Sequence, residues 1–107
     1  MKNIVLVLTE PTEGKQDEFD DYYENLHLDE VLSTTGWDTA KRFELVDEVG
    51  GKCPLKHLAL YEVETDDPAD IIPTLNRTRS ERQQSGALNK LTASVWVFSE
   101  TGSLHRR

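Results

Sequence analysis

The chain of 107 residues has a single cysteine, Cys53, so it can form neither an intrachain disulfide nor a thiolate cluster for zinc or an iron–sulfur centre. It also lacks any apolar run near the ~20 residues that a membrane-spanning helix needs. The apolar N-terminus is short, alternates like a strand and has no small-residue cleavage site, so no signal peptide is expected. These absences predict a cytoplasmic protein with no membrane contact.

Basic residues are scarce as well. Twelve lysines and arginines face 20 aspartates and glutamates, giving a net charge of −8, which repels a phosphate backbone and argues against a nucleic-acid partner. The three histidines, His27, His57 and His105, are dispersed along the chain without metal-ligand spacing. We therefore expect neither nucleic acid nor a bound metal.

What is present is typical of one globular domain over residues 1–107, with 36% hydrophobic and 30% charged residues. Residues 100–107 are expected to form a mobile tail or to cross to a partner. Periodicity predicts strands over 3–9, 37–46, 57–64 and 91–99, helices over 15–26 and 67–85, and a helical turn over 29–32. This β-α-β-β-α-β order predicts an α+β, ferredoxin-like domain: a four-stranded antiparallel sheet with two helices on one face.

The second helix has a clear start, because Asp67 can cap it and Pro68 suits its first position, with Asp70 favourable in the first turn. Pro73 falls further in and cannot donate to the helical ladder. Either the helix kinks at Pro73, which we favour, or it restarts there. Its arginines, Arg77, Arg79 and Arg82, are expected to pair with the acidic first helix.

Large apolar residues occupy both faces of the predicted strands. Val5 and Val7 alternate with Ile4, Leu6 and Leu8, and Val95 and Val97 alternate with Trp96 and Phe98. Two helices cover only one face, and an uncovered face this apolar usually binds a partner. The pattern therefore predicts a homodimer formed through the sheets. In the 57–64 strand the alternation does not decide which set faces the helices.

The segment 19–43 resembles the EthD-like family of the dimeric α+β barrel superfamily. The likeness lies in Tyr22-Tyr23-x-x-x-His27, in Gly36-Trp37 and in the Arg42-Phe43 pair, although Asp29 and Thr35 stand where that family commonly has prolines. The resemblance implies a dimeric α+β barrel with a cavity between helix and sheet in each protomer. It also implies cofactor-free cyclisation, decarboxylation, isomerisation or oxygenation of a small, often aromatic, ligand.

His27 is the candidate general acid or base, because imidazole titrates near neutral pH. Tyr23, four residues earlier and therefore on the same helical face, is its expected partner. The alternative is a histidine that caps the last carbonyls of the first helix. The candidate substrate-binding residues, each of which also fits ordinary packing or ion pairing, are Tyr22, Trp37, Arg42, Tyr61 and Trp96. For Arg42 the ordinary expectation is an ion pair with Glu62 or Glu64.

The leading functional hypothesis is a small cofactor-independent lyase, cyclase or isomerase that acts on a small aromatic or polyketide-like substrate. Two alternatives stay open: a ligand-binding or accessory protein without catalysis, and a cofactor-free monooxygenase. The sequence names neither the substrate nor the pathway.

Overall fold

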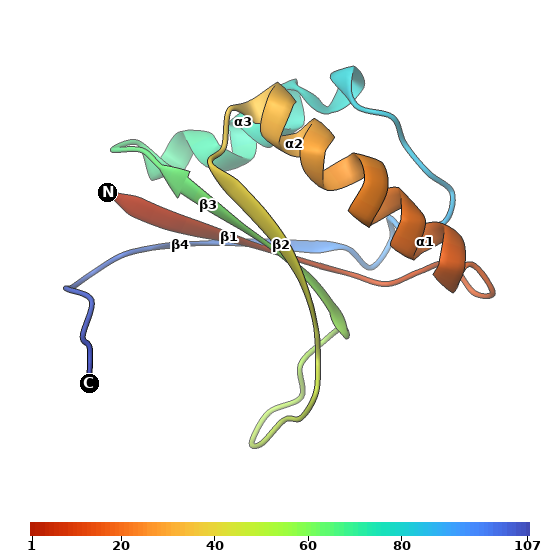
Figure 1. The fold of residues 1–107 in the computed structure, drawn as a ribbon, viewed down its shortest axis with the longest axis horizontal. Helices are drawn as coiled ribbons and strands as arrows, with labels where there is room; N and C mark the ends of the chain where they lie inside the picture. Colours follow the sequence, from red (N-terminus) through yellow and green to blue (C-terminus); the bar gives the residue numbers. More distant parts are fainter.

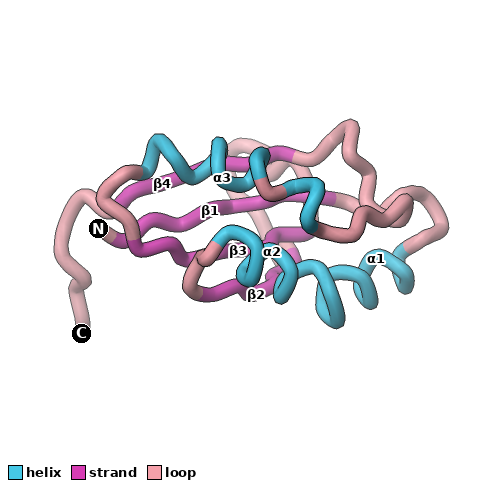
Figure 2. The backbone as a smooth tube through the Cα atoms, turned by 90° about the horizontal axis from the view of Figure 1, so that it is seen from above, coloured by secondary structure: helices cyan, strands magenta, loops and turns pink.

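Helices cover one face of a four-stranded antiparallel sheet in the computed structural model, which describes residues 1–107 (Figures 1 and 2). The elements are β1 (Lys2–Thr9), α1 (Gln16–Tyr22), α2 (Leu28–Thr35), β2 (Thr39–Glu44), β3 (His57–Glu64), α3 (Ile71–Arg77) and β4 (Ser94–Ser99). The strand order is β2-β3-β1-β4. This arrangement confirms the predicted ferredoxin-like α+β fold, including the antiparallel pairing of β2 with β3. No helix combines the length and apolarity needed to span a bilayer.

Strand register decides which side chains face the helices. Val5 of β1 lies opposite Tyr61 of β3 and Val97 of β4, and directly opposed residues share a face. Val5 and Tyr61 are buried, as are the helical residues Phe19 and Val31 that pack above them. The set Ala59, Tyr61 and Val63, which the sequence left unassigned, therefore faces the helices.

The first helical region is one continuous helix rather than two. Between α1 and α2, residues Tyr23–His27 form a π-helix, so the backbone passes through His27 without a break. The predicted joint at His27 was wrong, because the wider π turn absorbs an extra residue without ending the helix. The helix ends at Gly36, as expected, where a φ of 79° favours glycine.

The second helical region is shorter than predicted. A 3₁₀ turn over Pro68–Asp70 leads into α3, and a further 3₁₀ turn over Arg79–Glu81 ends the helical chain well before Ser85. Pro73 lies in the first turn of α3, where its missing N–H costs nothing, so the restart alternative holds and the kink that we favoured was wrong. The Asp67 side chain makes no capping hydrogen bond, contrary to expectation.

The end of this region is held by Arg82. Its backbone is extended (φ −113°, ψ 146°), and its guanidinium turns back to donate to the Leu75 carbonyl and to the hydroxyls of Thr34 and Thr78. Residues 83–93 then run as an irregular loop to β4. That strand starts at Ser94 instead of the predicted residue 91, and Leu91 is 97% exposed.

The opposite face of the sheet carries no helix (Figure 1). Leu6 lies opposite Leu60 and Trp96 on this face, and Trp96 and Phe98 are 44% and 52% exposed. The β2–β3 hairpin and the C-terminal tail both extend to this side of the sheet, away from the helices (Figure 1). The second apolar face predicted from strand alternation is therefore real and open.

Candidate functional site

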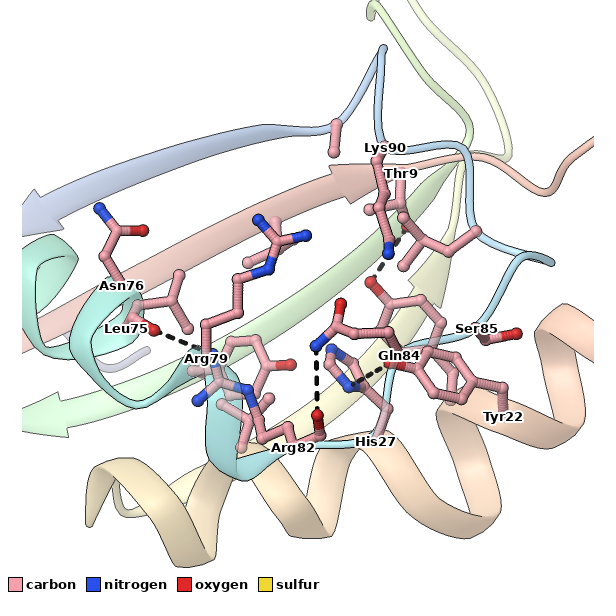
Figure 3. Close-up of a pocket in the computed structure, with 16 residues that line it drawn as sticks. Thr9, Tyr22, His27, Leu75, Asn76, Arg79, Arg82, Gln84, Ser85 and Lys90 are labelled. Carbon is pink, nitrogen blue, oxygen red and sulfur yellow. Dashed lines mark hydrogen bonds between the residues drawn. The ribbon is translucent and has the colours of Figure 1, made fainter.

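A cavity of about 210 Å³ lies between the helices and the sheet (Figure 3). Its walls come from three parts of the chain: the strands (Val7, Thr9, Tyr61), the long helix (Tyr22, Tyr23, His27, Val31), and α3 with the following loop (Leu75, Arg79, Arg82, Leu88, Lys90). Four of the seven candidates named from the sequence, Tyr22, Tyr23, His27 and Tyr61, line this cavity.

His27 is paired with Tyr22. The Tyr22 hydroxyl lies 2.9 Å from His27 Nδ1 and donates its proton to the Gln83 carbonyl, at 2.8 Å. Since that proton is committed to the carbonyl, the hydroxyl accepts from Nδ1–H. His27 is therefore the tautomer with its proton on Nδ1 and its lone pair on Nε2. The two rings also stack, with centroids 4.8 Å apart (Figure 3).

The sequence named Tyr23 as this partner, and that assignment was wrong. On an α-helix, residues five apart point about 140° away from each other, whereas residues four apart share a face. The π turn adds one residue to the turn, so the i, i+5 pair, Tyr22 and His27, comes together instead. Tyr23 meets the His27 ring edge-on at 5.0 Å, and its hydroxyl accepts a hydrogen bond from Thr9.

The second ring nitrogen of His27 is free. Nε2 has no hydrogen-bond partner within the protein and, since no sealed side-chain nitrogen or oxygen lacks one, it is accessible, on a residue that lines the cavity. Burial, and next the positive charge of Arg82, lower the pKa of His27 to about 4. The imidazole is therefore neutral at neutral pH, with an unpartnered lone pair on a side chain that lines the cavity. It does not cap a helix end, because the helix continues through it.

Tyr61 presents a hydroxyl to the same space. The residue is only 2% exposed, yet its Oη has no hydrogen-bond partner and is not sealed off, which directs it into the cavity. Burial raises the pKa of Tyr61, so the hydroxyl keeps its proton. A protonated phenol hydroxyl that has no partner within the protein can donate a hydrogen bond to a bound ligand. Tyr22 is similarly protonated, since burial raises its pKa to about 12.

Three predicted ligand contacts lie elsewhere. Trp96 is on the open face of the sheet, because its position in β4 has the opposite parity to the inward Val95 and Val97. Trp37 is buried against Tyr61, with ring centroids 5.3 Å apart, but does not line the cavity.

Arg42 also lies outside the cavity, and it is held by the first helix. Its Nη2 is 2.7 Å from Asp20 Oδ1, and this contact holds the pKa of Asp20 below its usual range. The expected pairs with Glu62 or Glu64 do not form. Arg42 lies opposite Ala59 on the helix-covered face, whereas Glu62, one position out of phase with Tyr61, lies on the other face and pairs with Lys2.

The sequence missed the positive charge of the site. Arg82 and Arg79 were expected to form interhelical pairs, but neither makes a salt bridge, and both line the cavity together with Lys90. Only Arg77 of that group has an acidic partner, Asp70 of its own helical region. The sequence did carry one signal for this charge. Arg79 and Arg82 are three residues apart, a spacing that places two side chains on the same side of a helical turn.

No family model matches the chain, and no curated protein matches it. The cavity therefore has to be interpreted from its own chemistry. No cluster of histidine, cysteine, aspartate and glutamate is arranged to hold a metal ion. The chemistry that the geometry does offer is proton transfer at His27 Nε2, beside the hydroxyl of Tyr61.

The buried neutral state of His27 predicts acid sensitivity. The pKa of His27 is lowered from 6.5 to about 4 in the fold, so between these values the unfolded chain binds a proton that the folded chain does not. The contribution of neutral His27 to the free energy of unfolding is therefore fully present above pH 6.5 and is lost as the pH falls towards 4. After allowance for solvent screening we expect a loss of roughly 1–2 kcal/mol.

Urea unfolding of the wild type and of His27→Gln, at neutral pH and at about pH 4.5 and one protein concentration, isolates this effect. The wild type should lose more stability than the variant. The carboxylates whose pKa values are lowered, such as Asp20 and Asp70, are the same in both proteins and cancel in the comparison. Equal losses in the two proteins would show that His27 is not held neutral by the fold.

Proposed function

We propose that this protein is a cofactor-independent enzyme that moves a proton on a small aromatic carbonyl compound, in a reaction of the isomerase, cyclase or lyase type. The observation that carries the proposal is the unpartnered, accessible Nε2 of His27, which Tyr22 fixes as a proton acceptor on a side chain that lines the cavity. A π-helical turn in the middle of a helix supports it, because such turns occur frequently at functional sites.

The proposed step is abstraction of a proton from a carbon next to a carbonyl group. His27 Nε2 takes the proton, the C–H electron pair moves into an enolate, and the Tyr61 hydroxyl donates to the enolate oxygen. If the enolate is conjugated with a C=C bond, return of the proton to the far carbon of that bond gives isomerisation; if the β-carbon carries a leaving group, the enolate expels it with its bonding electron pair, which is a lyase reaction. Tyr22 is a positioning residue, since it holds the imidazole in the required tautomer.

The size of the cavity limits the substrate. A cavity of about 150 Å³ holds benzene, so the 210 Å³ here suits a single six-membered ring with a short side chain. The apolar walls, which include Val7, Val31, Leu75 and Leu88, suit such a ring. A multi-ring polyketide-like compound fits only if part of it extends through the mouth of the cavity.

Deuterium exchange tests this step without knowledge of the full reaction. Phenylpyruvate, which has an enolisable carbon beside its ketone, is incubated with the protein in deuterated buffer, and NMR follows loss of the methylene proton signal. Exchange well above the buffer rate is expected for phenylpyruvate or its methyl ester. Exchange at the buffer rate for both probes would contradict the proposal.

A non-catalytic ligand-binding protein is the second candidate. It is favoured by one observation, the pKa of about 4 for His27, which makes the imidazole a weak base in the empty site. The two candidates differ in the same assay, because a binding protein would show ligand binding with exchange at the buffer rate.

We further propose that the protein belongs to the EthD-like family and assembles as a homodimer. Membership of the EthD-like family is supported by the Tyr22-Tyr23-x-x-x-His27 segment, whose tyrosines and histidine all line the cavity. A homodimer that closes the two sheets into an α+β barrel is supported by the open apolar face, on which Leu6, Leu60 and Trp96 form one row. The hairpin and tail extend to the same side, on which a second copy would lie (Figure 1).

Trp96→Glu is expected to convert this dimer to a monomer, because it puts a charge on the apolar face, beside Leu6. Sedimentation should give twice the chain mass of 12.2 kDa for the wild type and 12.2 kDa for the variant. Leu91→Glu is the matched control, since Leu91 is equally apolar but lies in the loop and is almost fully exposed. A monomeric wild type, or a variant that stays dimeric, would rule out assembly through this face.

A further inference from the structure

Arg82 is a buried cation without an acidic partner. It is 7% exposed, and its hydrogen bonds go only to neutral groups, two threonine hydroxyls and the Leu75 carbonyl. Buried charges are almost always paired, because an unpaired charge loses its hydration without compensation. Burial lowers the pKa of Arg82, and the charges of Glu30 and Glu81 act against this without forming a salt bridge; the Glu30 carboxylate accepts from the Gln83 backbone N–H. The fold therefore keeps a positive charge without a direct ionic partner at the wall of the cavity.

The rest of the cavity has the same sign. Arg79 and Lys90, which reach the cavity from different parts of the chain (Figure 3), make no salt bridge. None of the 16 lining residues is an aspartate or glutamate, although the chain carries 20 of them and a net charge of −8. A site that is positive in an acidic protein attracts anions and, in a partly dehydrated space, holds them more strongly than an exposed surface does.

We infer that the natural ligand carries a carboxylate, which binds at Arg82 while its aromatic ring fills the apolar part of the cavity. This rests on the proposed function and names the class of its substrate. Guanidinium groups bind carboxylates through paired N–H donors, and Arg82 Nε has no acceptor within the protein and is not sealed off. The ring then lies among Val31, Leu75 and Tyr61, beside the free Nε2 of His27.

A monocyclic aromatic carboxylate is favoured over inorganic phosphate by the shape and composition of the space. Half of the lining residues are hydrophobic, and the volume suits one ring with a short acidic group. Inorganic phosphate would occupy only the polar part of the cavity and leave the apolar walls in contact with water. The ligand class is therefore a monocyclic aromatic carboxylate.

Binding of benzoate, benzamide and inorganic phosphate, followed by NMR chemical shifts of the wild-type protein, tests the inference. Benzoate and benzamide have nearly the same shape and differ in charge. We expect benzoate to bind about 10- to 100-fold more tightly than benzamide, the range given by a charge-assisted hydrogen bond, and phosphate not to displace it. Equal binding of benzamide, or displacement by phosphate at equal concentration, would overturn the inference.

Two sets of variants test which positively charged side chains bind the carboxylate. Arg82→Met should lose benzoate binding at least 10-fold, while Arg82→Lys should recover part of it. Because Arg82 also holds the end of its helical region, the double variant Arg79→Gln, Lys90→Gln provides a test that leaves the core untouched; it should weaken benzoate binding and leave benzamide unchanged. Arg77→Gln, which removes another exposed arginine that is paired outside the cavity, is the matched control. Unchanged benzoate binding in the double variant and in Arg82→Lys would overturn the inference.

The inference and the proposed function fail in different ways. Selective benzoate binding without deuterium exchange would refute the enzyme and leave the ligand class standing. Exchange of the uncharged methyl ester as fast as phenylpyruvate itself would support the enzyme and refute the ligand class.

Discussion

Replacing His27 with glutamine is expected to slow enzyme-catalysed deuterium exchange into phenylpyruvate by about 10²–10⁴-fold, the usual contribution of a general base. Glutamine has a similar size and keeps a polar group beside Tyr22, but it has no titratable lone pair at the position of Nε2. The loss should therefore lie in the rate at saturating substrate rather than in KM.

Two comparisons make this result specific. Benzoate binding by His27→Gln should stay near the wild-type value, which shows that the cavity is intact. His57→Gln is the matched control: His57 packs against Phe19, 5.0 Å between ring centroids, and does not line the cavity. Full exchange activity in His27→Gln, or an equal loss in His57→Gln, would remove His27 from the mechanism.

The two sites of the proposal act on each other. Arg82 is the second cause, after burial, of the low pKa of His27. A carboxylate bound at Arg82 offsets that positive charge and favours an imidazolium nearby, so the basicity of Nε2 rises when substrate is present. A base that is weak in the empty site is thus compatible with catalysis in the occupied one.

The sequence predicted the fold well because binary patterning determines it. Alternation in β1 and β3 marks the strands, and Gly36 marks the helix end, each by a local rule. The predicted extent of the second helical region was wrong, because a tertiary contact determines where this region ends. Arg82 reaches across to Thr34, 48 residues earlier in the chain, and no local pattern indicates that the chain turns there.

The site was predicted only in part, because some of its contacts also depend on tertiary structure. His27 and Tyr22 belong to the segment 19–43 that the sequence singled out, whereas the inward face of Tyr61 becomes clear only from the strand register. The pairing of Tyr22 with His27 requires the π turn, which leaves no mark in the spacing of residues. Arg82 and Lys90 come from the end of one helical region and from a loop, so their meeting depends on the path of residues 83–93. Charge counts along the chain favoured surface ion pairs instead.

Removal of the Tyr61 hydroxyl, in Tyr61→Phe, is expected to lower the exchange rate by about 10²–10³-fold, the typical effect of losing one donor to a developing oxyanion. The ring would remain packed against Trp37, and no hydrogen bond within the protein is lost, since Oη has no partner. The variant should therefore be as stable as the wild type or more stable, because a poorly hydrated hydroxyl is removed from the interior. Exchange kinetics and urea unfolding measure the two quantities.

Tyr23→Phe is the matched comparison, because it removes a hydroxyl from the same cavity that already has a partner, Thr9. Here stability should fall by about 1 kcal/mol, while the exchange rate changes less than in Tyr61→Phe. The opposite pattern, a stability loss in Tyr61→Phe with an unchanged rate, would show that its hydroxyl is structural. In that case the enolate would lack its donor, and His27 alone would have to account for any exchange.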